Sequence, residues 1–397
     1  MNYKLIVTKK EDKIISALYH ENNMIQVNID DTKNMSILGN IYVGKVKNIV
    51  KNIDAAFVEI TKGVMCYLSL KESTHPIFCN AKNNDKVNIG DEIIVQVSKE
   101  EVKSKAPVVT CNLNFTGKYI VLTHGKTMIG TSNKITQETE RIRLKNIVSE
   151  YKTKDYGFII RTNSSGAKEE PIRQEISTLI SLYQEVRQYG IHKSPFSLIY
   201  EAPLNFICEI RDGYQTLIDE IITDHSWIYE KIQTYLSNFQ KEDQNKLRMY
   251  EDPLLSLSNL YNIDNQLEKA LKDKVWLKSG GNLVIQPTEA LTVIDVNTSK
   301  AIRGKKKAEE TYLKINLEAA KEIADQLRLR NISGIIIIDF INMEETNSKN
   351  ILMKELRILL EKDPIKTTVI DMTPLNLVEV TRKKVRKPLY EQYNVRR

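Results

Sequence analysis

Two aspartates stand directly after apolar runs of the same kind, and together they could hold a metal ion. The runs are residues 291–294 and 335–338, and they are followed by Asp295 and Asp339. Proteins usually hold Mg²⁺ with one or two carboxylates, while water and a substrate phosphate complete its shell. A bound metal ion can activate water and offset charge that develops on phosphorus. The pair therefore predicts a site for phosphate chemistry.

The residues around these aspartates are predicted to form a strand, a helix and a second strand. Apolar runs rich in β-branched residues are typical of strands buried on both faces, in a parallel or mixed sheet between helices. Between the runs, apolar residues recur at helical spacing, namely Tyr312, Ile315, Ala319, Ile323 and Leu327. This order places both carboxylates at the carboxyl ends of their strands, where open α/β sheets bind ligands. The alternative is that each aspartate only caps the loop or helix after its strand.

The same stretch resembles the catalytic core of the ribonuclease E and ribonuclease G family of bacterial endoribonucleases. The resemblance rests on the motifs IDVN, NLEAAKEIADQLRLR and GIIIIDFINM, in that order. It implies that Asp295 and Asp339 bind Mg²⁺ and that Asn297 positions the scissile phosphate. It also implies that a metal-activated water cleaves single-stranded RNA, leaving a 5′-monophosphate and a 3′-hydroxyl. Asn342 departs from the family pattern, which commonly has an aspartate there.

Residues 36–111 resemble an S1 domain, a five-stranded barrel of the OB type that binds single-stranded RNA. The segments that carry the resemblance are GNIYVGKVKNIVKNIDAAFVEI, GVMCYLSL and VNIGDEIIVQV, with turns predicted at Gly39, Gly44, Gly63 and Gly90. Such barrels bind RNA in a basic groove where bases stack on exposed aromatic rings. The resemblance implies that Phe57 and Tyr67 stack on bases and that Lys105 lies near the RNA. The alternative is that both rings are core residues of their strands.

Residues 112–206 resemble the part of the family that senses the 5′-monophosphate of an RNA. The strand GFIIRT ends in Arg161 and Thr162 and runs into the loop TNSSGAKEE. The resemblance implies that these two residues grip the terminal phosphate. A guanidinium suits bidentate phosphate binding, and a hydroxyl adds a further donor. Without the resemblance, an arginine at a strand end would be a common surface residue.

The resemblance covers the chain and implies a multidomain α/β protein of four parts. An RNase H-like structural subdomain combines residues 1–35 and 207–275. The S1 domain, 36–111, and the 5′-sensor domain, 112–206, are inserted within it. A DNase I-like catalytic domain follows at 276–397, and its first turn, at residues 279–282, is predicted to join a hairpin.

Local patterns predict the elements of these parts. Strands are predicted at 4–8, 14–19, 24–29, 119–122, 157–161, 205–211, 275–277, 283–285 and 367–371. Helices are predicted at 136–150, 171–189, 214–222, 226–239 and 349–361. Asp212, Asp219 and Asp224 are not assigned to a second metal site, because they follow no predicted pair of buried strands.

Composition and charge agree with an RNA-binding protein outside the secretory pathway. The chain has 397 residues, 27% of them charged, and a formal net charge of +7. Basic residues cluster after Asp295 and near the carboxyl terminus: Lys300, Arg303, Lys305, Lys306, Lys307, Arg382, Lys383, Lys384, Arg386, Lys387, Arg396 and Arg397. Such clusters suit a polyanion, although lysine-rich runs are often only solvated faces. The four cysteines form no CxxC pair, and neither a signal peptide nor a membrane run is present, which predicts a cytoplasmic protein.

These features predict a Mg²⁺-dependent endoribonuclease that acts on single-stranded RNA, such as mRNA, rRNA or tRNA precursors, in RNA processing and decay. Family members typically continue into a CPxC motif whose thiolates share zinc with a second subunit. The sequence stops at Arg397 without it, so a zinc-linked homodimer is not expected and any homodimer would rest on other contacts. One alternative is a non-catalytic S1-type RNA-binding protein with a decayed nuclease core. Another is a DNA nuclease, which the DNase I-like core suggests and the S1 features disfavour.

Overall fold

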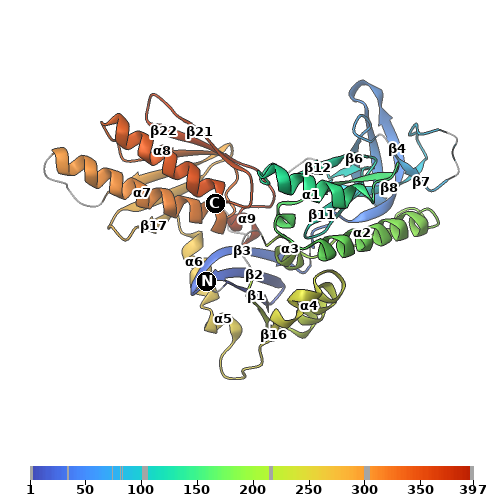
Figure 1. The fold of residues 1–397 in the computed structure, drawn as a ribbon, viewed down its shortest axis with the longest axis horizontal. Helices are drawn as coiled ribbons and strands as arrows, with labels where there is room; N and C mark the ends of the chain where they lie inside the picture. Colours follow the sequence, from blue (N-terminus) through green and yellow to red (C-terminus); the bar gives the residue numbers. More distant parts are fainter. Residues whose placement is uncertain are drawn as a thin grey trace. The chain divides into compact units, whose positions relative to one another are not determined.

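The computed structural model describes residues 3–33, 35–73, 75–80, 82, 84–100, 106–213, 218–298 and 305–393, without the side chains of 305–307. The chain folds into two compact units (Figure 1). The first unit comprises Met1–Lys33, Leu217–Gln233 and Asn245–Arg397. The second unit comprises Asn34–Thr216 and Thr234–Gln244. Within the described residues, no helix is long and apolar enough to cross a membrane.

The first unit contains a five-stranded sheet in the order β16-β15-β1-β2-β3. Its strands are β1 (Tyr3–Lys10), β2 (Lys13–His20), β3 (Asn23–Asp31), β15 (Glu220–Thr223) and β16 (Leu247–Met249). The first three strands are antiparallel and confirm the three strands predicted near the amino terminus. Strand β15 runs parallel to β1 and β16. Helices α5 (Leu257–Leu260), α6 (Ile263–Leu271) and α9 (Leu389–Gln392) contribute to the core of this sheet.

Two predictions between residues 205 and 224 are wrong. The segment predicted as a strand at 205–211 is helix α3 (Asn205–Asp212), because Phe206, Ile207 and Ile210 share one buried helical face. The helix predicted at 214–222 is strand β15 over its last residues, and 214–217 lie outside the described residues. Helix α4 (Ser226–Phe239) is confirmed.

Strand β15 also changes the argument about Asp224. That residue directly follows β15, which is a buried strand between two parallel neighbours, so the reason given for setting Asp224 aside is wrong. Its carboxylate accepts hydrogen bonds from the Thr8 hydroxyl at 2.9 and 3.0 Å. Across the described part of the chain, no group of three or more His, Cys, Asp or Glu residues could hold a metal ion. Asp224 therefore has a structural partner and no metal cluster around it.

A six-stranded sheet in the order β17-β18-β19-β20-β22-β21 forms the rest of the first unit. Its strands are β17 (Lys274–Trp276), β18 (Asn282–Pro287), β19 (Leu291–Asn297), β20 (Gly334–Asp339), β21 (Thr367–Met372) and β22 (Leu377–Arg382). Neighbours β19 and β20 are parallel, and the other pairs are antiparallel. The hairpin of β17 and β18 is confirmed. Strand β22 was not predicted, since its residues were assigned to the basic tail.

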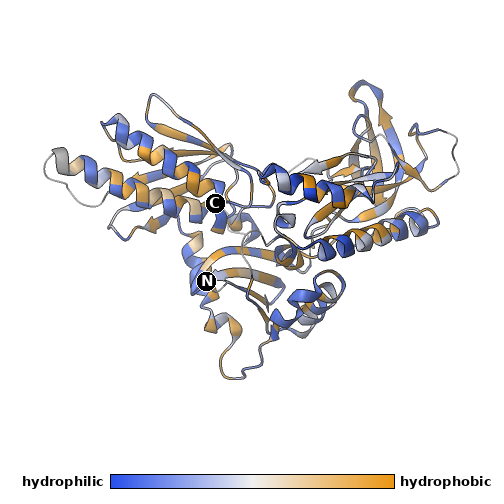
Figure 2. Ribbon diagram, in the orientation of Figure 1, coloured by the Kyte–Doolittle hydropathy of each residue, from blue (hydrophilic) through white to orange (hydrophobic). Residues whose placement is uncertain are grey.

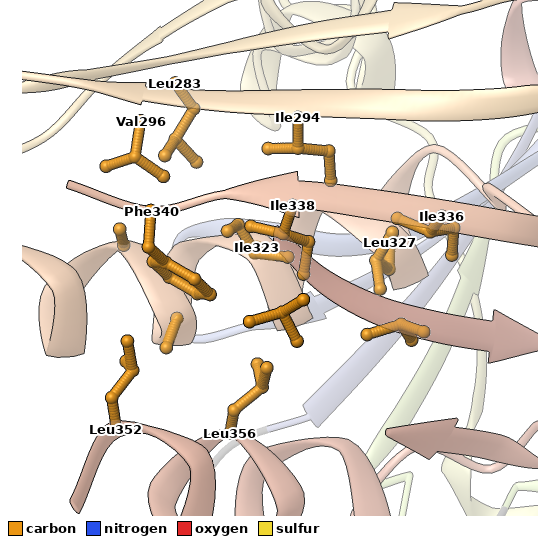
Figure 3. Packing of buried hydrophobic residues seen from close by; sticks show 14 of the residues in the cluster. Leu283, Ile294, Val296, Ile323, Leu327, Ile336, Ile338, Phe340, Leu352 and Leu356 are labelled. Atoms are coloured by element: carbon orange, nitrogen blue, oxygen red, sulfur yellow. The ribbon is translucent and has the colours of Figure 1, made fainter. Parts of the chain in front are cut away.

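The described helices α7 (Lys305–Leu329) and α8 (Thr346–Glu361) pack on one face of this sheet, and Ile335 on the other face is half-exposed, so the prediction that its strands are buried on both faces is wrong. Helices α7 and α8 pack in one core with Ile294, Ile336 and Ile338 (Figure 3). Hydrophobic and hydrophilic residues alternate along both helices, as in amphipathic helices (Figure 2). On the other face of β20, Ile335 is 51% exposed. Side chains of a strand alternate between faces, so the odd-numbered residues of β19 and β20 belong to the uncovered face.

The second unit contains a closed five-stranded barrel. Its strands β4 (Ile41–Val50), β5 (Ala55–Thr61), β6 (Val64–Ser69), β9 (Val108–Thr110) and β8 (Glu92–Lys99) are joined in that order, and β4 also pairs with β8. Strands β14 (Leu198–Tyr200) and β7 (Ile77–Phe78) extend it. Gly39, Gly63 and Gly90 have positive φ at turns, as predicted. Gly44 instead lies inside β4, where a Cβ atom would come 2.4 Å from Val58 Cγ1, so this position needs glycine.

A four-stranded sheet with two helices completes the second unit. The sheet has the order β10-β11-β13-β12. The elements are β10 (Asn114–Thr116), β11 (Ile120–His124), β12 (Ile129–Thr131), β13 (Tyr156–Ile160), α1 (Glu138–Ser149) and α2 (Glu169–Gly190). Leu122, Phe158 and Ile176 belong to the core that joins the helices to the sheet. The strands and helices predicted between 119 and 189 are thus confirmed.

Candidate active site and RNA-binding surfaces

Asp295 and Asp339 lie directly opposite each other on the two parallel strands of the six-stranded sheet. They form the last register pair of β19 and β20, where neighbouring strands are about 4.8 Å apart. Their neighbours Ile294 and Ile338 are fully buried in the helix-facing core. By alternation, both carboxylates stand on the face that α7 and α8 do not cover. Asp339 is exposed and Asp295 is half-buried, so the pair is open to a ligand.

Asn297 joins the same site through Asp295. Its side-chain Nδ2 donates a hydrogen bond to Asp295 Oδ2 at 2.6 Å. No other described residue donates a hydrogen bond to the Asp295 carboxylate, and none donates one to the Asp339 carboxylate. A capping role would need backbone N–H groups bonded to these carboxylates. The described residues therefore give no support to the capping alternative.

The electrostatics of the pair suit a cation. Burial, and then the negative charge of Asp295, raise the pKa of Asp339 above its ordinary value. Two carboxylates that repel each other are stabilised by a positive ion between them. Their oxygen ligands match Mg²⁺, which needs only one or two carboxylates because it retains water and phosphate ligands. The residues present thus fit a divalent cation of this type.

A buried asparagine that the sequence analysis did not single out fixes the chain just after Asp339. Asn316, on α7, donates to the Ile341 carbonyl at 2.8 Å and accepts from the Ile341 N–H at 3.0 Å. Asn316 is fully buried. A polar amide at a buried position of an apolar helix face is the signal that could have revealed it. The side chain connects α7 to the end of β20 and thereby restricts the position of Asp339.

Asn342, at a position where the resemblance leads us to expect an aspartate, belongs to a chain of neutral and cationic groups. Its Oδ1 accepts a hydrogen bond from Asn376 Nδ2 at 3.2 Å. Lys349 Nζ, on α8, donates in turn to Asn376 Oδ1 at 2.9 Å. Asn376 has a φ of 63° and directly precedes Leu377, which pairs with Asp339. The amide chain therefore links α8 to the strand beside the carboxylate pair.

The two aromatic residues predicted to bind RNA pair on the outer face of the barrel. Phe57 and Tyr67 are opposite each other on β5 and β6, with ring centroids 6.3 Å apart at 81°. Both side chains are half-buried, whereas Ala56 and Val58 beside Phe57 are fully buried. The alternative that these rings belong to the core does not match this alternation. Lys105 lies outside the described residues.

The register adds a cation to this row that sequence reasoning missed. Phe57 pairs with Asn48 on one side, and Tyr67 pairs with Val108 on the other. Val108 pairs in turn with Lys99, which is exposed. A row of partners across a sheet shares one face. Lys99 therefore lies in the same row as both rings.

Arg161 and Thr162 lie at the end of β13 in the four-stranded sheet. Arg161 Nη1 forms an ion pair with Asp212 Oδ1 at 2.8 Å and also donates to the Gly117 carbonyl. The Thr162 hydroxyl is 2.9 Å from the Ser132 hydroxyl. The Arg161 side chain is 23% exposed, so part of it remains open to solvent.

Glu175 is a second residue that the sequence analysis missed. It belongs to α2 and is 4% exposed, and its carboxylate accepts hydrogen bonds from three backbone N–H groups at 2.6, 2.7 and 2.8 Å, those of Lys118, Tyr119 and Ile120. Burial raises the pKa of Glu175, although these N–H groups act in the opposite direction. The sequence signal that could have revealed it is a glutamate on the same helical face as the apolar residues Ile172 and Ile176, both of which are buried.

One member of the carboxyl-terminal basic cluster is not available to a polyanion. Arg382 is 3% exposed and donates from Nε to Asp363 Oδ2 at 2.7 Å. It is the last residue of β22, so counting it among RNA-facing cations was wrong. Lys383 and Lys384 are exposed. Of the cluster after Asp295, Lys300 and Arg303 lie outside the described residues, as do the side chains of Lys305, Lys306 and Lys307.

Two family models match neighbouring parts of this chain. A family model described as "Ribonuclease E/G family" matches residues 114–385, and one described as "S1 RNA binding domain" matches 37–112. Ribonuclease G of Haemophilus influenzae is 34% identical over 395 residues, which cover 96% of this chain and 79% of that protein. Ribonuclease G of Escherichia coli K12 is 32% identical, covering 96% and 80%. Ribonuclease E of Nostoc sp. is 33% identical, covering 96% of this chain and 56% of that protein.

Proposed function

This chain belongs to the ribonuclease E/G family, and from that membership we infer that it is an endoribonuclease that cleaves single-stranded RNA in RNA processing and decay. The observation that carries this proposal is the register pair of Asp295 and Asp339 on the sheet face that α7 and α8 do not cover. The S1 barrel supports RNA as the substrate. A folded protein that only bound RNA would have no need for two repelling carboxylates at this edge.

In the proposed mechanism, Asp295 and Asp339 would hold Mg²⁺ at the site where the scissile phosphate binds. The chemistry that such an ion supplies when bound is a lowered pKa of water and relief of charge on phosphorus. Asn297 donates one N–H to Asp295, which leaves its second N–H for a phosphate oxygen. Attack by water on phosphorus, with cleavage of the P–O3′ bond and proton uptake by the leaving 3′-oxygen, would give a 5′-monophosphate and a 3′-hydroxyl; attack by the ribose 2′-hydroxyl would not.

The parts of the chain have separate proposed tasks. The six-stranded sheet is proposed as a DNase I-like catalytic domain, and the β16-β15-β1-β2-β3 sheet as an RNase H-like structural subdomain. The row of Phe57, Tyr67 and Lys99 would hold the RNA by stacking and charge. Arg161 and Thr162 would read the terminal phosphate at the 5′ end. Lys105 stays a prediction of the sequence.

Substitution of the carboxylates tests the proposal directly. With Mg²⁺ and a 5′-phosphorylated, AU-rich single-stranded RNA, Asp295→Asn and Asp339→Asn should abolish cleavage while RNA binding persists. The matched control is Asp371→Asn, which changes an exposed aspartate of β21 in the same sheet and should cleave normally. Near-normal cleavage by either site variant would refute the two-carboxylate site.

The same assay separates the alternative functions. A non-catalytic RNA-binding protein predicts that the parent chain binds the RNA but leaves it intact under every metal condition. A DNA nuclease predicts that a single-stranded DNA of matched sequence is cleaved and competes with the RNA. Cleavage of the RNA alone, dependent on both aspartates, is the outcome expected here.

A further inference from the structure

The Arg161 guanidinium uses only one of its nitrogen atoms for contacts within the protein. Nη1 donates a hydrogen bond to the Gly117 carbonyl and forms an ion pair with Asp212 Oδ1 at 2.8 Å. Within the described residues, Nε and Nη2 of Arg161 have no hydrogen-bond partner. The edge formed by Nε and Nη2 is one that guanidinium groups use to bind phosphate through two parallel hydrogen bonds.

We propose that Asp212 is a positioning residue for recognition of the RNA 5′ end, because it holds Nη1 of Arg161 and leaves the Nε–Nη2 edge to the terminal phosphate. The proposal rests on the function proposed above for Arg161 and adds a residue to it. Neither the motifs of the sequence nor the resemblance to the family pointed to Asp212.

Asp212 is itself held in place by a buried partner. It is the last residue of α3, and Arg211 donates to it from Nε at 2.8 Å and from Nη2 at 2.9 Å. The Arg211 side chain is 12% exposed and also donates to the Thr116 carbonyl at 3.3 Å. Burial would raise the pKa of Asp212, but the hydrogen bonds from Arg211 and the charge of Arg161 outweigh it and hold the pKa low. The carboxylate is therefore fixed and ionised at neutral pH.

The second contact of Nη1, the Gly117 carbonyl, is equally well fixed. Glu175 accepts the backbone N–H groups of the three residues that follow Gly117. A Cβ atom at position 117 would come 2.3 Å from Glu175 Cδ, so only glycine fits there. Both contacts of Nη1 thus depend on buried groups that cannot shift easily. The guanidinium is oriented before any RNA arrives.

A carboxylate beside a phosphate-binding arginine could instead compete with the phosphate. Two features favour positioning over competition. First, the ion pair to Asp212 is made through Nη1, and within the described residues the three N–H groups of Nε and Nη2 donate no hydrogen bond, so they are left for a ligand. Second, Arg211 donates a hydrogen bond to each oxygen of Asp212. The group of Arg211, Asp212 and Arg161 has two positive charges and one negative charge, so its net charge is positive. A preoriented cation binds a phosphate with less loss of side-chain freedom.

The test compares kcat/KM for two RNAs that differ only in a 5′-monophosphate or a 5′-hydroxyl. Asp212→Ala should lower the ratio of kcat/KM for the 5′-monophosphate RNA to kcat/KM for the 5′-hydroxyl RNA by roughly tenfold. The change should come mainly from a higher KM for the phosphorylated RNA, because the Arg161 guanidinium is no longer held in one orientation. Asp212→Asn should lie between parent and alanine variant, since its amide oxygen keeps the contact to Nη1. The control Asp155→Ala breaks an exposed ion pair to Arg187 in the same unit and should leave the ratio unchanged.

Two results would overturn the proposal. An unchanged ratio in Asp212→Ala would mean that Arg161 needs no positioning, and an increased ratio would mean that Asp212 competes with the phosphate. Arg161→Ala separates this failure from failure of the sensor itself. If Arg161→Ala keeps the preference, the sensor assignment is wrong; if it loses the preference while Asp212→Ala keeps it, only the role of Asp212 is wrong. Should the alanine variant fail to fold in thermal melts, the isosteric Asp212→Asn carries the same comparison.

Discussion

Replacing Phe57 by alanine should weaken RNA binding more than it weakens the fold. The ring lies on the outer face of the barrel and is half-buried, with its edge against Tyr67. A fully buried phenylalanine would cost about 3–5 kcal/mol on truncation. A half-buried ring should cost about 1–2 kcal/mol, which includes the lost contact with Tyr67. Loss of one stacked base should weaken binding by about 1–3 kcal/mol, or roughly 5-fold to 150-fold in Kd.

The assay is a binding titration run beside thermal melts. A fluorescent single-stranded RNA with a 5′-hydroxyl keeps the proposed 5′ sensor out of the measurement, and omission of divalent cations prevents cleavage. The matched control is Val58→Ala, which truncates the neighbouring residue on the fully buried face of β5. That variant should lose stability, while its folded fraction binds RNA with unchanged affinity. Phe57→Tyr keeps the ring and should keep the affinity.

The reasoning fails if Phe57→Ala behaves like the buried control. A large drop in melting temperature with normal binding by the folded fraction would mean that the ring stabilises the barrel and contacts no base. Equal loss of affinity in Phe57→Ala and Val58→Ala would point to a general distortion of the barrel.

Three further outcomes follow from other contacts. Lys99→Ala should weaken RNA binding and lower the slope of log Kd against log salt concentration by about one unit, as titrations at several salt concentrations would show. Arg382→Ala should lower the free energy of unfolding by about 3–5 kcal/mol in urea titrations, because it removes the cation that balances the charge of the buried Asp363 carboxylate. The hydrogen bond from Arg143 lowers the pKa of Glu140 to about 2. The ionised Glu140 therefore stabilises the folded protein fully above about pH 4.5, and this stabilisation is lost as the pH falls toward 2. Glu140→Gln should therefore be less stable at pH 7 by about 1 kcal/mol, with a difference that shrinks over that range in melts at stepped pH.

The sequence was sufficient for elements whose pattern is long and unambiguous. The strand–helix–strand around the two aspartates and the three amino-terminal strands follow from apolar runs and spacing alone. The run at 335–338 could not reveal its exposed face, because four successive isoleucines carry no alternation. Ile336 is fully buried and Ile335 half-exposed for a tertiary reason, namely that both helices pack on one side.

Errors concentrate where short segments carry mixed signals. The eight residues of α3 place Phe206, Ile207 and Ile210 at spacings that fit either a strand or a helix, and packing decides between them. Strand β22 was not predicted because its last residue, Arg382, lies among other basic residues and was assigned to a basic tail. Its buried ion pair with Asp363 is visible only in the structure. Its partner strand β20 lies about 40 residues earlier in the sequence, so no local sequence pattern predicts that the two strands pair.

The polar residues at the proposed sites show why the function was harder to derive from the sequence than the fold. Asp295 and Asp339 could be recognised because each lies at or near the carboxyl end of a strand, and strand ends have a defined place in a sheet. Asp212, Glu175 and Asn316 act through contacts that only the folded chain creates. Each is a polar group that binds backbone or a charged partner near a residue with proposed chemistry. The aspartates proposed to bind metal could be predicted from their position along a strand, whereas the residues that fix the positions of their neighbours are visible only in the three-dimensional contacts.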